Sequence, residues 1–137
     1  MEETKILVIE DEDGAREIIA RCLKRKGYPT LSAATAKDGL ELVKKEHPNI
    51  ILLDIRLEDG SGLEVLKEIK ELDRNMKVIM VTALEDEVTI HQAKALGADD
   101  YVTKPLTMDF LDNLILEKIS ELNLHRRIVE IDKGIGN

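Results

Sequence analysis

Acidic, hydroxyl and lysine side chains stand at the ends of short apolar runs in this sequence. Glu10 and Asp11 follow ILVI, Asp54 follows IILL, Thr82 closes KVIMVT and Lys104 follows DYVT. A run of four aliphatic residues is typical of a strand that is buried on both faces, and a charge at its end is costly unless it is paired or serves a site. These five residues therefore form a candidate site, provided that the fold brings their strands together.

Three carboxylates at one place require a cation to offset their repulsion. Oxygen ligands favour Mg²⁺, which keeps several waters and takes one or two carboxylates together with a phosphate oxygen. Such a set suits phosphoryl transfer onto Asp54, with Mg²⁺ held by Asp11 to neutralise the charge that develops on oxygen. Lys104 and Thr82 would bind the remaining phosphoryl oxygens. The aspartyl phosphate adds about −1.5 to −2 charge, to which a hydroxyl and a lysine can respond.

Short apolar runs alternate with longer amphipathic ones along the chain. Apolar residues recur at helical spacing from Ala15 to Leu23, and this helix is expected to end at Gly27. Thr35 and Ser61 each precede an acidic residue by three positions, a pattern that predicts capped helix N-termini. The expected strands are 5–10, 29–33, 50–53, 77–82 and 100–103, and a helix follows each, the fourth over about 85–96 and the last from Thr107 to Leu122.

Strands that alternate with helices form a parallel sheet that is covered on both faces and wound right-handedly. Five such units match the flavodoxin-like (βα)5 fold, a doubly wound α/β arrangement with strand order 2-1-3-4-5. The winding reverses between strands 1 and 3, so a site is expected at their carboxyl ends. Neighbouring strands lie about 4.8 Å apart, so Glu10, Asp11 and Asp54 should meet at one edge of the sheet. Strands 4 and 5 bring Thr82 and Lys104 to the same edge.

The composition excludes several classes of protein. The 137 residues suit one domain, and the formal net charge of −8 argues against direct nucleic-acid binding, which needs clustered Lys and Arg. The single cysteine, Cys22, excludes an internal disulfide, so a cytoplasmic location is expected. No apolar run approaches the length of a membrane span and no signal-type segment follows the N-terminus, so we expect no membrane association.

Four segments of the chain form a set of motifs in a fixed order: ILVIEDE at 6–12, LLDIRLEDGSGLEVL at 52–66, VIMVTA at 78–83 and GADDYVTKPL at 97–106. Through these segments the chain resembles a response-regulator receiver domain of two-component signalling, over about residues 4–120. The resemblance implies a phosphorylation-dependent switch that catalyses only its own phosphorylation and dephosphorylation. It also implies a sensor histidine kinase or phosphotransfer protein as donor, and an output domain or downstream protein as target.

The resemblance assigns a role to each residue of the site. On phosphorylation, Thr82 would move toward the phosphoryl group and Tyr101 would turn inward, which reshapes the face formed by the fourth helix, the fifth strand and the fifth helix. The Lys104–Pro105 peptide bond is implied to be cis. Glu10 departs from the family, which usually has Asp there. The implied Mg²⁺ ligands are Glu10, Asp11, Asp54 and the main-chain carbonyl of Arg56, and the implied phosphorylation residues are Asp54, Thr82 and Lys104.

Each of these residues also has a purely structural interpretation. Asp54 could cap the loop after its strand, and Thr82 could cap the helix that follows it. Lys104 could be an ordinary surface lysine, and Tyr101 suits a half-buried position on an edge strand. The acidic run after the first strand could be a solvated turn with Asp13 as the helix N-cap.

Other functions are disfavoured by particular residues. A phosphatase of the haloacid-dehalogenase type needs a second Asp two positions after the nucleophile, where this chain has Arg56. The acidic loop EDEDG at 10–14 would repel the phosphate of a flavin carrier, and no G-x-x-x-x-G-K-[ST] segment is present. The remaining rival is a pseudo-receiver, a protein-binding module with the same fold that is not regulated by phosphorylation.

Residues 1–122 are expected to form the receiver domain. Residues 123–137 continue with Leu124, Ile128 and Ile131 at near-helical spacing. This segment could extend the last helix and pair two chains as a homodimer, begin a linker to an output domain, or fray as a chain end. The sequence leaves open whether the regulator stands alone or continues into an output domain.

Overall fold

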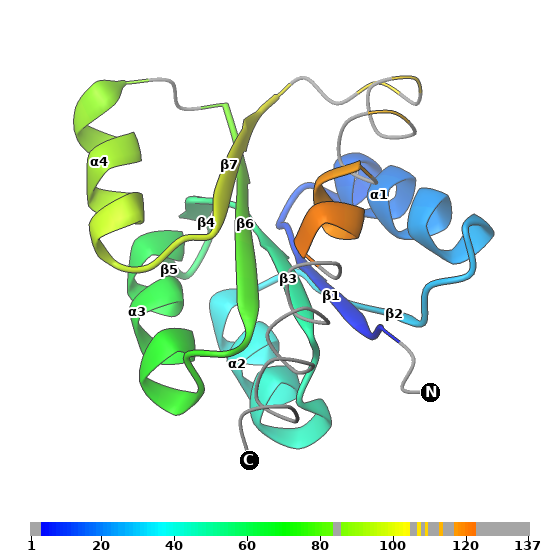
Figure 1. Cartoon of the computed structure of the whole chain (residues 1–137), viewed down its shortest axis with the longest axis horizontal. Helices are drawn as coiled ribbons and strands as arrows, with labels where there is room; N and C mark the ends of the chain where they lie inside the picture. Colours follow the sequence, from blue (N-terminus) through cyan, green and yellow to red (C-terminus); the bar gives the residue numbers. More distant parts are fainter. Residues whose placement is uncertain are drawn as a thin grey trace, which may run out of the picture.

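A parallel sheet of five strands forms the centre of the protein in the computed structural model (Figure 1). Its strands are β1 (Ile6–Ile9), β2 (Thr30–Ala33), β3 (Ile50–Leu53), β6 (Lys77–Thr82) and β7 (Asp100–Thr103). They lie in the order β2-β1-β3-β6-β7, which is 2-1-3-4-5 when the strands of this sheet are counted along the chain. The predicted flavodoxin-like, doubly wound α/β fold is therefore confirmed.

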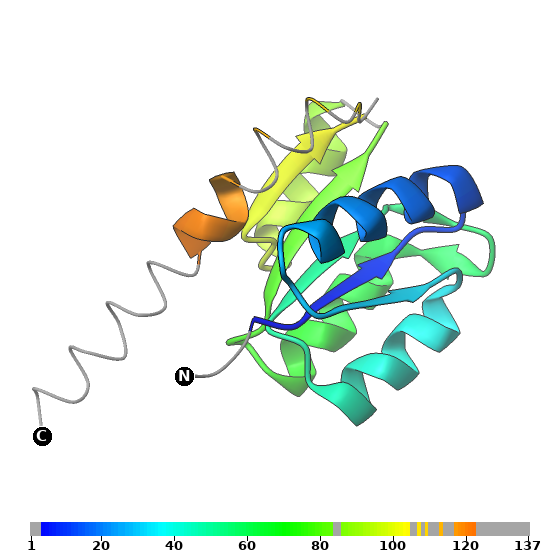
Figure 2. The same ribbon diagram turned by 90° about the vertical axis from the view of Figure 1, so that its right-hand side faces the viewer.

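Helices cover both faces of the sheet (Figures 1 and 2). The first helix and the short helical segment 117–122 lie on one face, and the other three helices lie on the opposite face (Figure 2). This division follows from right-handed crossovers: the connection from β1 to β2 runs in one direction along the sheet, and the later connections to β3, β6 and β7 run in the other. The helices are α1 (Asp13–Arg25), α2 (Ala36–Glu46), α3 (Gly62–Leu72) and α4 (Glu87–Ala95).

The aliphatic strands contribute to two separate apolar cores because successive side chains point to opposite faces. In β1, Leu7 and Ile9 belong to the core beneath α2 and α3, whereas Ile6 and Val8 belong to the core beneath α1. In β3 every residue from Ile50 to Leu53 is buried. The two central strands are thus held from both sides, and the residues that follow them have little freedom to move.

Most helix boundaries agree with the sequence analysis. The Thr35 hydroxyl accepts a hydrogen bond from the Asp38 N–H at 3.1 Å and caps α2 as predicted. The Ser61 hydroxyl caps α3 by accepting from the Leu63 N–H at 3.2 Å. After α1 the chain turns at Gly27, whose φ of 93° lies in the left-handed region that favours glycine.

Three local predictions were wrong. Asp13 is the first residue of α1 rather than its N-cap, and the N-cap Glu12 makes no side-chain capping bond. The fourth helix begins at Glu87 instead of about residue 85, because the Asp86 carboxylate caps it by accepting from the Thr89 N–H at 2.7 Å. Ile18, expected on the inner face of α1, is 40% exposed.

The segment between β3 and α3, predicted only as a polar loop, contains a short hairpin. Its two strands are β4 (Arg56–Leu57) and β5 (Gly60–Ser61), paired antiparallel with Arg56 opposite Ser61. Only two residues, Glu58 and Asp59, form its turn. Each strand has only two residues, so the alternation of apolar and polar side chains that marks a strand in a sequence does not repeat.

The structure describes residues 4–83, 86–104, 107, 109, 113 and 117–122. Within this part of the chain, no helix is both long and apolar enough to cross a membrane. The cis bond expected at Pro105 lies outside the described residues, as do the apolar positions Leu111, Leu114 and Ile115 of the last helix and the whole segment 123–137. Ile119, expected on the inner face of that helix, is described and is fully buried in the core beneath α1.

Candidate functional site

The parallel register brings the ends of β1 and β3 to the same level. Ile9 pairs with Leu53, so the residues that follow them, Glu10 and Asp54, emerge side by side. Main-chain hydrogen bonds fix both positions: the Glu10 N–H donates to the Ala33 carbonyl at 3.1 Å, and the Asp54 N–H donates to the Ile9 carbonyl at 3.1 Å. The hydrogen bonds of the sheet therefore fix the main-chain positions from which the two carboxylate side chains extend.

The expected carboxylate cluster is present in the structure. One oxygen from each of Glu10, Asp11 and Asp54 lies within 4.8 Å of the others. Glu10 is 2% exposed and Asp54 is 6% exposed, so neither belongs to a solvated turn. Three oxygen donors of this kind, with no sulfur or imidazole among them, fit a hard cation such as Mg²⁺.

Lys104 connects β7 to this cluster. Its main-chain N–H donates to the Thr82 carbonyl at 2.9 Å, which fixes the residue at the end of the sheet. Its side-chain ammonium donates to Asp54 Oδ2 at 2.7 Å and to Glu10 Oε1. With 16% of its side chain exposed, Lys104 is an internal counter-ion to the acids rather than a surface lysine.

The shared environment changes how these groups titrate. The pKa of Glu10 is raised from 4.5 to about 7. Burial is the largest cause, the hydrogen bond from Lys104 opposes it, and the negative charge of Asp54 adds to it. Burial alone would lower the pKa of Lys104, but its bonds to Asp54 and Glu10 outweigh this and raise it. Lys104 therefore stays charged, and one proton is readily held on Glu10.

Gly62 allows the start of α3 to lie directly against the main chain of Asp54. Its N–H donates to the Ile55 carbonyl at 2.6 Å. A Cβ atom at Gly62 would lie 2.0 Å from the Asp54 carbonyl oxygen, so no larger residue fits without moving the backbone. The sequence analysis placed a turn and helix start at this segment, but did not recognise that the glycine packs against the main chain of Asp54.

Arg16 is a second residue that the sequence analysis missed. From α1, its guanidinium donates to the Glu10 carbonyl at 2.9 Å and to the Asp11 carbonyl at 3.5 Å. It also forms an ion pair with Asp13 at 2.5 Å. The guanidinium thus holds the acidic loop to the helix that follows it. The available signal was a cation one helical turn after an acidic loop, which is common on helices that have no such role.

The two predicted switch residues lie on neighbouring strands. Thr82, at the end of β6, is 1% exposed, and Tyr101 in β7 is half-buried and packs against the core beneath α2 and α3. Tyr101 also lines a hollow of about 300 Å³ together with Ile90, Ala93 and Lys94 of α4. The structure therefore places Tyr101 where its edge strand meets α4.

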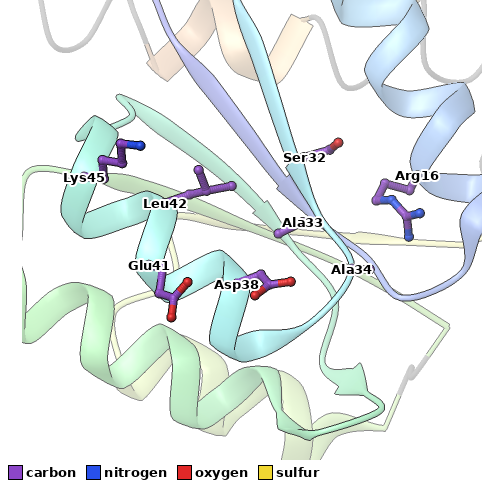
Figure 3. Close-up of a pocket in the computed structure, with 8 residues that line it drawn as sticks. All are labelled: Arg16, Ser32, Ala33, Ala34, Asp38, Glu41, Leu42 and Lys45. Atoms are coloured by element: carbon purple, nitrogen blue, oxygen red, sulfur yellow. The ribbon is translucent and has the colours of Figure 1, made fainter.

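A separate groove of about 560 Å³ runs beside the edge strand β2 (Figure 3). Ser32 and Ala33 of β2 form its floor, Asp38 and Glu41 of α2 lie on one side, and Arg16 approaches from α1 (Figure 3). Neither Asp54 nor Lys104 lines it. The charged residues that line this groove are spread along α1 and α2. They do not meet at one point, as the carboxylates and Lys104 do at the sheet edge.

The sequence profile of the response regulator receiver domain matches residues 6–116. The chain therefore belongs to the response regulator receiver domain family. Receiver domains are signalling modules of two-component systems rather than metabolic enzymes, and they exchange phosphoryl groups with histidine kinases or phosphotransfer proteins. They typically bind Mg²⁺ at an acidic pocket, and the cluster described above is compatible with one.

Particular relatives agree with this assignment. Sporulation initiation phosphotransferase F of Bacillus subtilis is 36% identical over 105 residues, which are 77% of this chain and 85% of that protein. Transcriptional regulatory protein AfsQ1 of Streptomyces coelicolor is 36% identical over 78% of this chain but only 47% of its own length, so the chain spans about half of that regulator. A CheY-like receiver domain from Methanospirillum hungatei has a similar crystal structure, with a TM-score of 0.82, 32% identity and coverage of 90% of this chain and 99% of that one.

Proposed function

We propose that the protein is a signalling switch that accepts a phosphoryl group on Asp54. The observation that carries the proposal is the placement of this carboxylate: it is nearly buried, 2.7 Å from the Lys104 ammonium, and clustered with two further acids. A residue that only capped a loop would need none of these partners. Asp54 does accept a loop hydrogen bond, from the Arg56 N–H at 3.2 Å, but this bond uses Oδ1, whereas Lys104 binds Oδ2.

The proposed reaction is an in-line displacement at phosphorus. A carboxylate oxygen of Asp54 forms a bond to phosphorus while the bond from phosphorus to the donor breaks, and the leaving group takes the electron pair. The donor is the phosphohistidine of a histidine kinase or phosphotransfer protein, or a small acyl phosphate. Lys104 is placed to bind a phosphoryl oxygen once its bond to Asp54 opens.

The acids around Asp54 are proposed to hold Mg²⁺. The ligands are Glu10, Asp11, Asp54 and the main-chain carbonyl of Arg56, and the ion when bound supplies charge neutralisation at the phosphoryl oxygens. Glu10 Oε1 accepts from Lys104, so a cation bound through this oxygen would compete with that bond. Loosening it would help the ammonium, which also bonds to Asp54, to turn toward the incoming phosphoryl group.

The phosphorylated site is proposed to signal through Thr82 and Tyr101. Thr82 ends the strand next to β3, so its hydroxyl can move toward a phosphoryl group on Asp54. Tyr101 borders the hollow beside α4, which provides space for its ring to shift. The face around α4 and β7 would then contact an output domain or a downstream protein.

Phosphorylation in solution tests the proposal directly. The protein is incubated with acetyl phosphate and Mg²⁺, and intact mass is recorded. We expect one added phosphoryl group, absent for Asp54→Asn and absent when EDTA removes Mg²⁺. Asp73→Asn serves as the matched control: Asp73 caps the far end of α3, where its carboxylate accepts from the Asn75 N–H at 2.8 Å, and it should label like the wild type.

A wild-type protein that binds no Mg²⁺ and takes up no phosphoryl group would overturn the proposal. The chain would then be a pseudo-receiver that uses the same fold only to bind a protein. Labelling that persists in Asp54→Asn would instead show that another residue accepts the phosphoryl group.

A further inference from the structure

The turn of the β4/β5 hairpin carries a carboxylate that binds a different element. Asp59 Oδ1 accepts a hydrogen bond from the Ala36 N–H at 2.8 Å, and Asp59 Oδ2 accepts one from the Lys37 N–H at 3.1 Å. Both N–H groups belong to the first turn of α2, more than twenty residues away in the sequence. The loop after the phosphoacceptor is therefore tied directly to the neighbouring helix.

Together with Thr35, this carboxylate completes the cap of α2. The Thr35 hydroxyl accepts from the Asp38 N–H, so the first three N–H groups of the helix are all satisfied. The backbone bonds from Ala36 and Lys37 lower the pKa of Asp59 below its usual range. A carboxylate at this position also meets the positive end of the helix dipole.

The hairpin connects this anchor to the phosphorylation site. Its first residue, Arg56, donates its N–H to Asp54 Oδ1 at 3.2 Å. Its last residue, Ser61, caps α3. The inner side of the hairpin is held by Leu57, which is 8% exposed, while the turn residue Glu58 and Gly60 are exposed. A two-stranded ladder of this length has little stability of its own, so its position depends on these external contacts.

We infer that Asp59 is a positioning residue for the phosphorylation site. By binding the first turn of α2, it holds the hairpin so that the main chain of Arg56 stays next to Asp54. This inference rests on the proposed function, in which the Arg56 carbonyl is a Mg²⁺ ligand. Without the anchor, that carbonyl would sample more positions and the metal site would be less preorganised.

The chain offers a matched pair of variants to test this role. Thr35→Ala removes one capping bond of α2 without touching the hairpin, whereas Asp59→Ala removes capping bonds and also frees the hairpin. Urea denaturation in EDTA measures the loss of stability in each variant. Titration calorimetry with MgCl₂ measures the dissociation constant for Mg²⁺ in the same proteins.

We expect both variants to lower the urea midpoint and only Asp59→Ala to weaken Mg²⁺ binding. The expected loss of affinity is about tenfold, at the low end of the range for residues that act on a metal site through its ligands. Asp59→Asn keeps one acceptor oxygen, so it should bind Mg²⁺ with intermediate affinity. This milder variant also supplies the measurement if Asp59→Ala does not fold.

Two outcomes would overturn the inference. If Asp59→Ala binds Mg²⁺ as tightly as the wild type, Asp59 is only a helix cap. If Thr35→Ala weakens Mg²⁺ binding as much as Asp59→Ala, the effect comes from α2 as a whole and not from the hairpin anchor. A wild-type protein that binds no Mg²⁺ is a different result, because it removes the proposed metal site itself and the inference with it.

Discussion

Two of the three clustered carboxylates share one ammonium at the edge of the sheet. Lys104 bonds to Asp54 and to Glu10, and Asp11 completes the acidic cluster. One positive charge offsets only part of this negative charge, which is why the burial of Glu10 raises its pKa so strongly. Glutamate is one methylene longer than aspartate, and here its Oε1 reaches the ammonium. In this chain, Glu10 can therefore either pair with Lys104 or join a metal site.

The raised pKa of Glu10 predicts how the metal-free protein responds to pH. A folded-state pKa of about 7 against an ordinary value of 4.5 means that the folded protein binds this proton more tightly than the unfolded chain does. The resulting stability is fully present below pH 4.5 and is lost as pH rises to about 7. We expect the free energy of unfolding of the wild type, relative to Glu10→Gln, to fall by about 2 to 3 kcal/mol over this range.

Urea denaturation in EDTA at a series of pH values measures this difference. Glu12→Gln is the control, because it removes an exposed carboxylate from the same loop and leaves the buried Glu10 in place. A wild type that gained stability relative to Glu10→Gln as pH rose would show that Lys104 keeps Glu10 ionised, contrary to this expectation.

The elements around the site are joined at their ends, in addition to the packing of the helices on the faces of the sheet. The end of β3 leads into the β4/β5 hairpin, the hairpin caps both α2 and α3, and α1 holds the acidic loop through Arg16. Each joint satisfies main-chain groups that a helix or strand leaves unpaired at its terminus. The ends of these elements therefore hold one another at the positions that the site requires.

The contact between Gly62, the first residue of α3, and the main chain of Asp54 predicts a sharp difference between two glycines. Gly62→Ala forces a Cβ against the Asp54 carbonyl, whereas a Cβ at Gly60 meets no atom within 4 Å. We expect Gly62→Ala to lower the free energy of unfolding by about 2 to 3 kcal/mol. Gly60→Ala should change it by less than about 0.5 kcal/mol.

Urea denaturation measures both losses, and the acetyl phosphate assay measures their effect on the site. Gly62→Ala should also slow the labelling of Asp54, because the backbone shift moves the carboxylate away from Lys104. Equal free energies of unfolding and equal labelling rates in the two variants would mean that the close approach of Gly62 to Asp54 does not restrict the residue at position 62.

The molecule as a whole combines a rigid sheet with a site at one edge. Its two apolar cores hold β1 and β3 from both sides, and β2 and β7 form the two edges of the sheet. Tyr101 lies on one of these edge strands, next to α4, whose only buried residue among those described is Ala93. Under the proposed function, a change at the site would therefore reach the surface through a segment that few buried side chains hold in place.

The extent of the domain predicts the effect of truncation. We propose that the domain ends at Leu122, so a chain that ends there should unfold at the same urea concentration as the full chain. Ile119, just before this boundary, is fully buried. A chain that ends at residue 116 loses this side chain and should be less stable by about 2 to 4 kcal/mol. A lower midpoint for the chain ending at Leu122 would place the domain boundary within 123–137.

Sedimentation of the same proteins tests the proposed homodimer. Beryllofluoride serves as a mimic of the phosphoryl group. If residues 123–137 pair two chains, its addition should double the sedimenting mass of the full chain and leave the mass of the chain ending at Leu122 unchanged. Equal masses for both chains under all conditions would remove this role for the segment.

Much of the fold and the principal members of the site could be predicted from the sequence alone. Alternating aliphatic runs and amphipathic stretches, with hydroxyl caps at Thr35 and Ser61, determine the five strands and the order of the helices. These signals are local: they depend on residues one to four positions apart. Because parallel strands end at a common edge, the positions of Glu10, Asp54 and Lys104 followed from the same reasoning.

Only the tertiary structure decided how the site is held together. Three contacts join segments that the helix and strand periodicities do not relate to one another. They are the Asp59 cap on α2, the Arg16 bonds to the acidic loop and the close approach of Gly62 to Asp54. The raised pKa of Glu10 likewise depends on burial and on charges brought from two other strands. A sequence pattern reports the periodicity of each element, whereas these contacts exist only after the elements have packed, since packing determines which distant groups share one low-dielectric space.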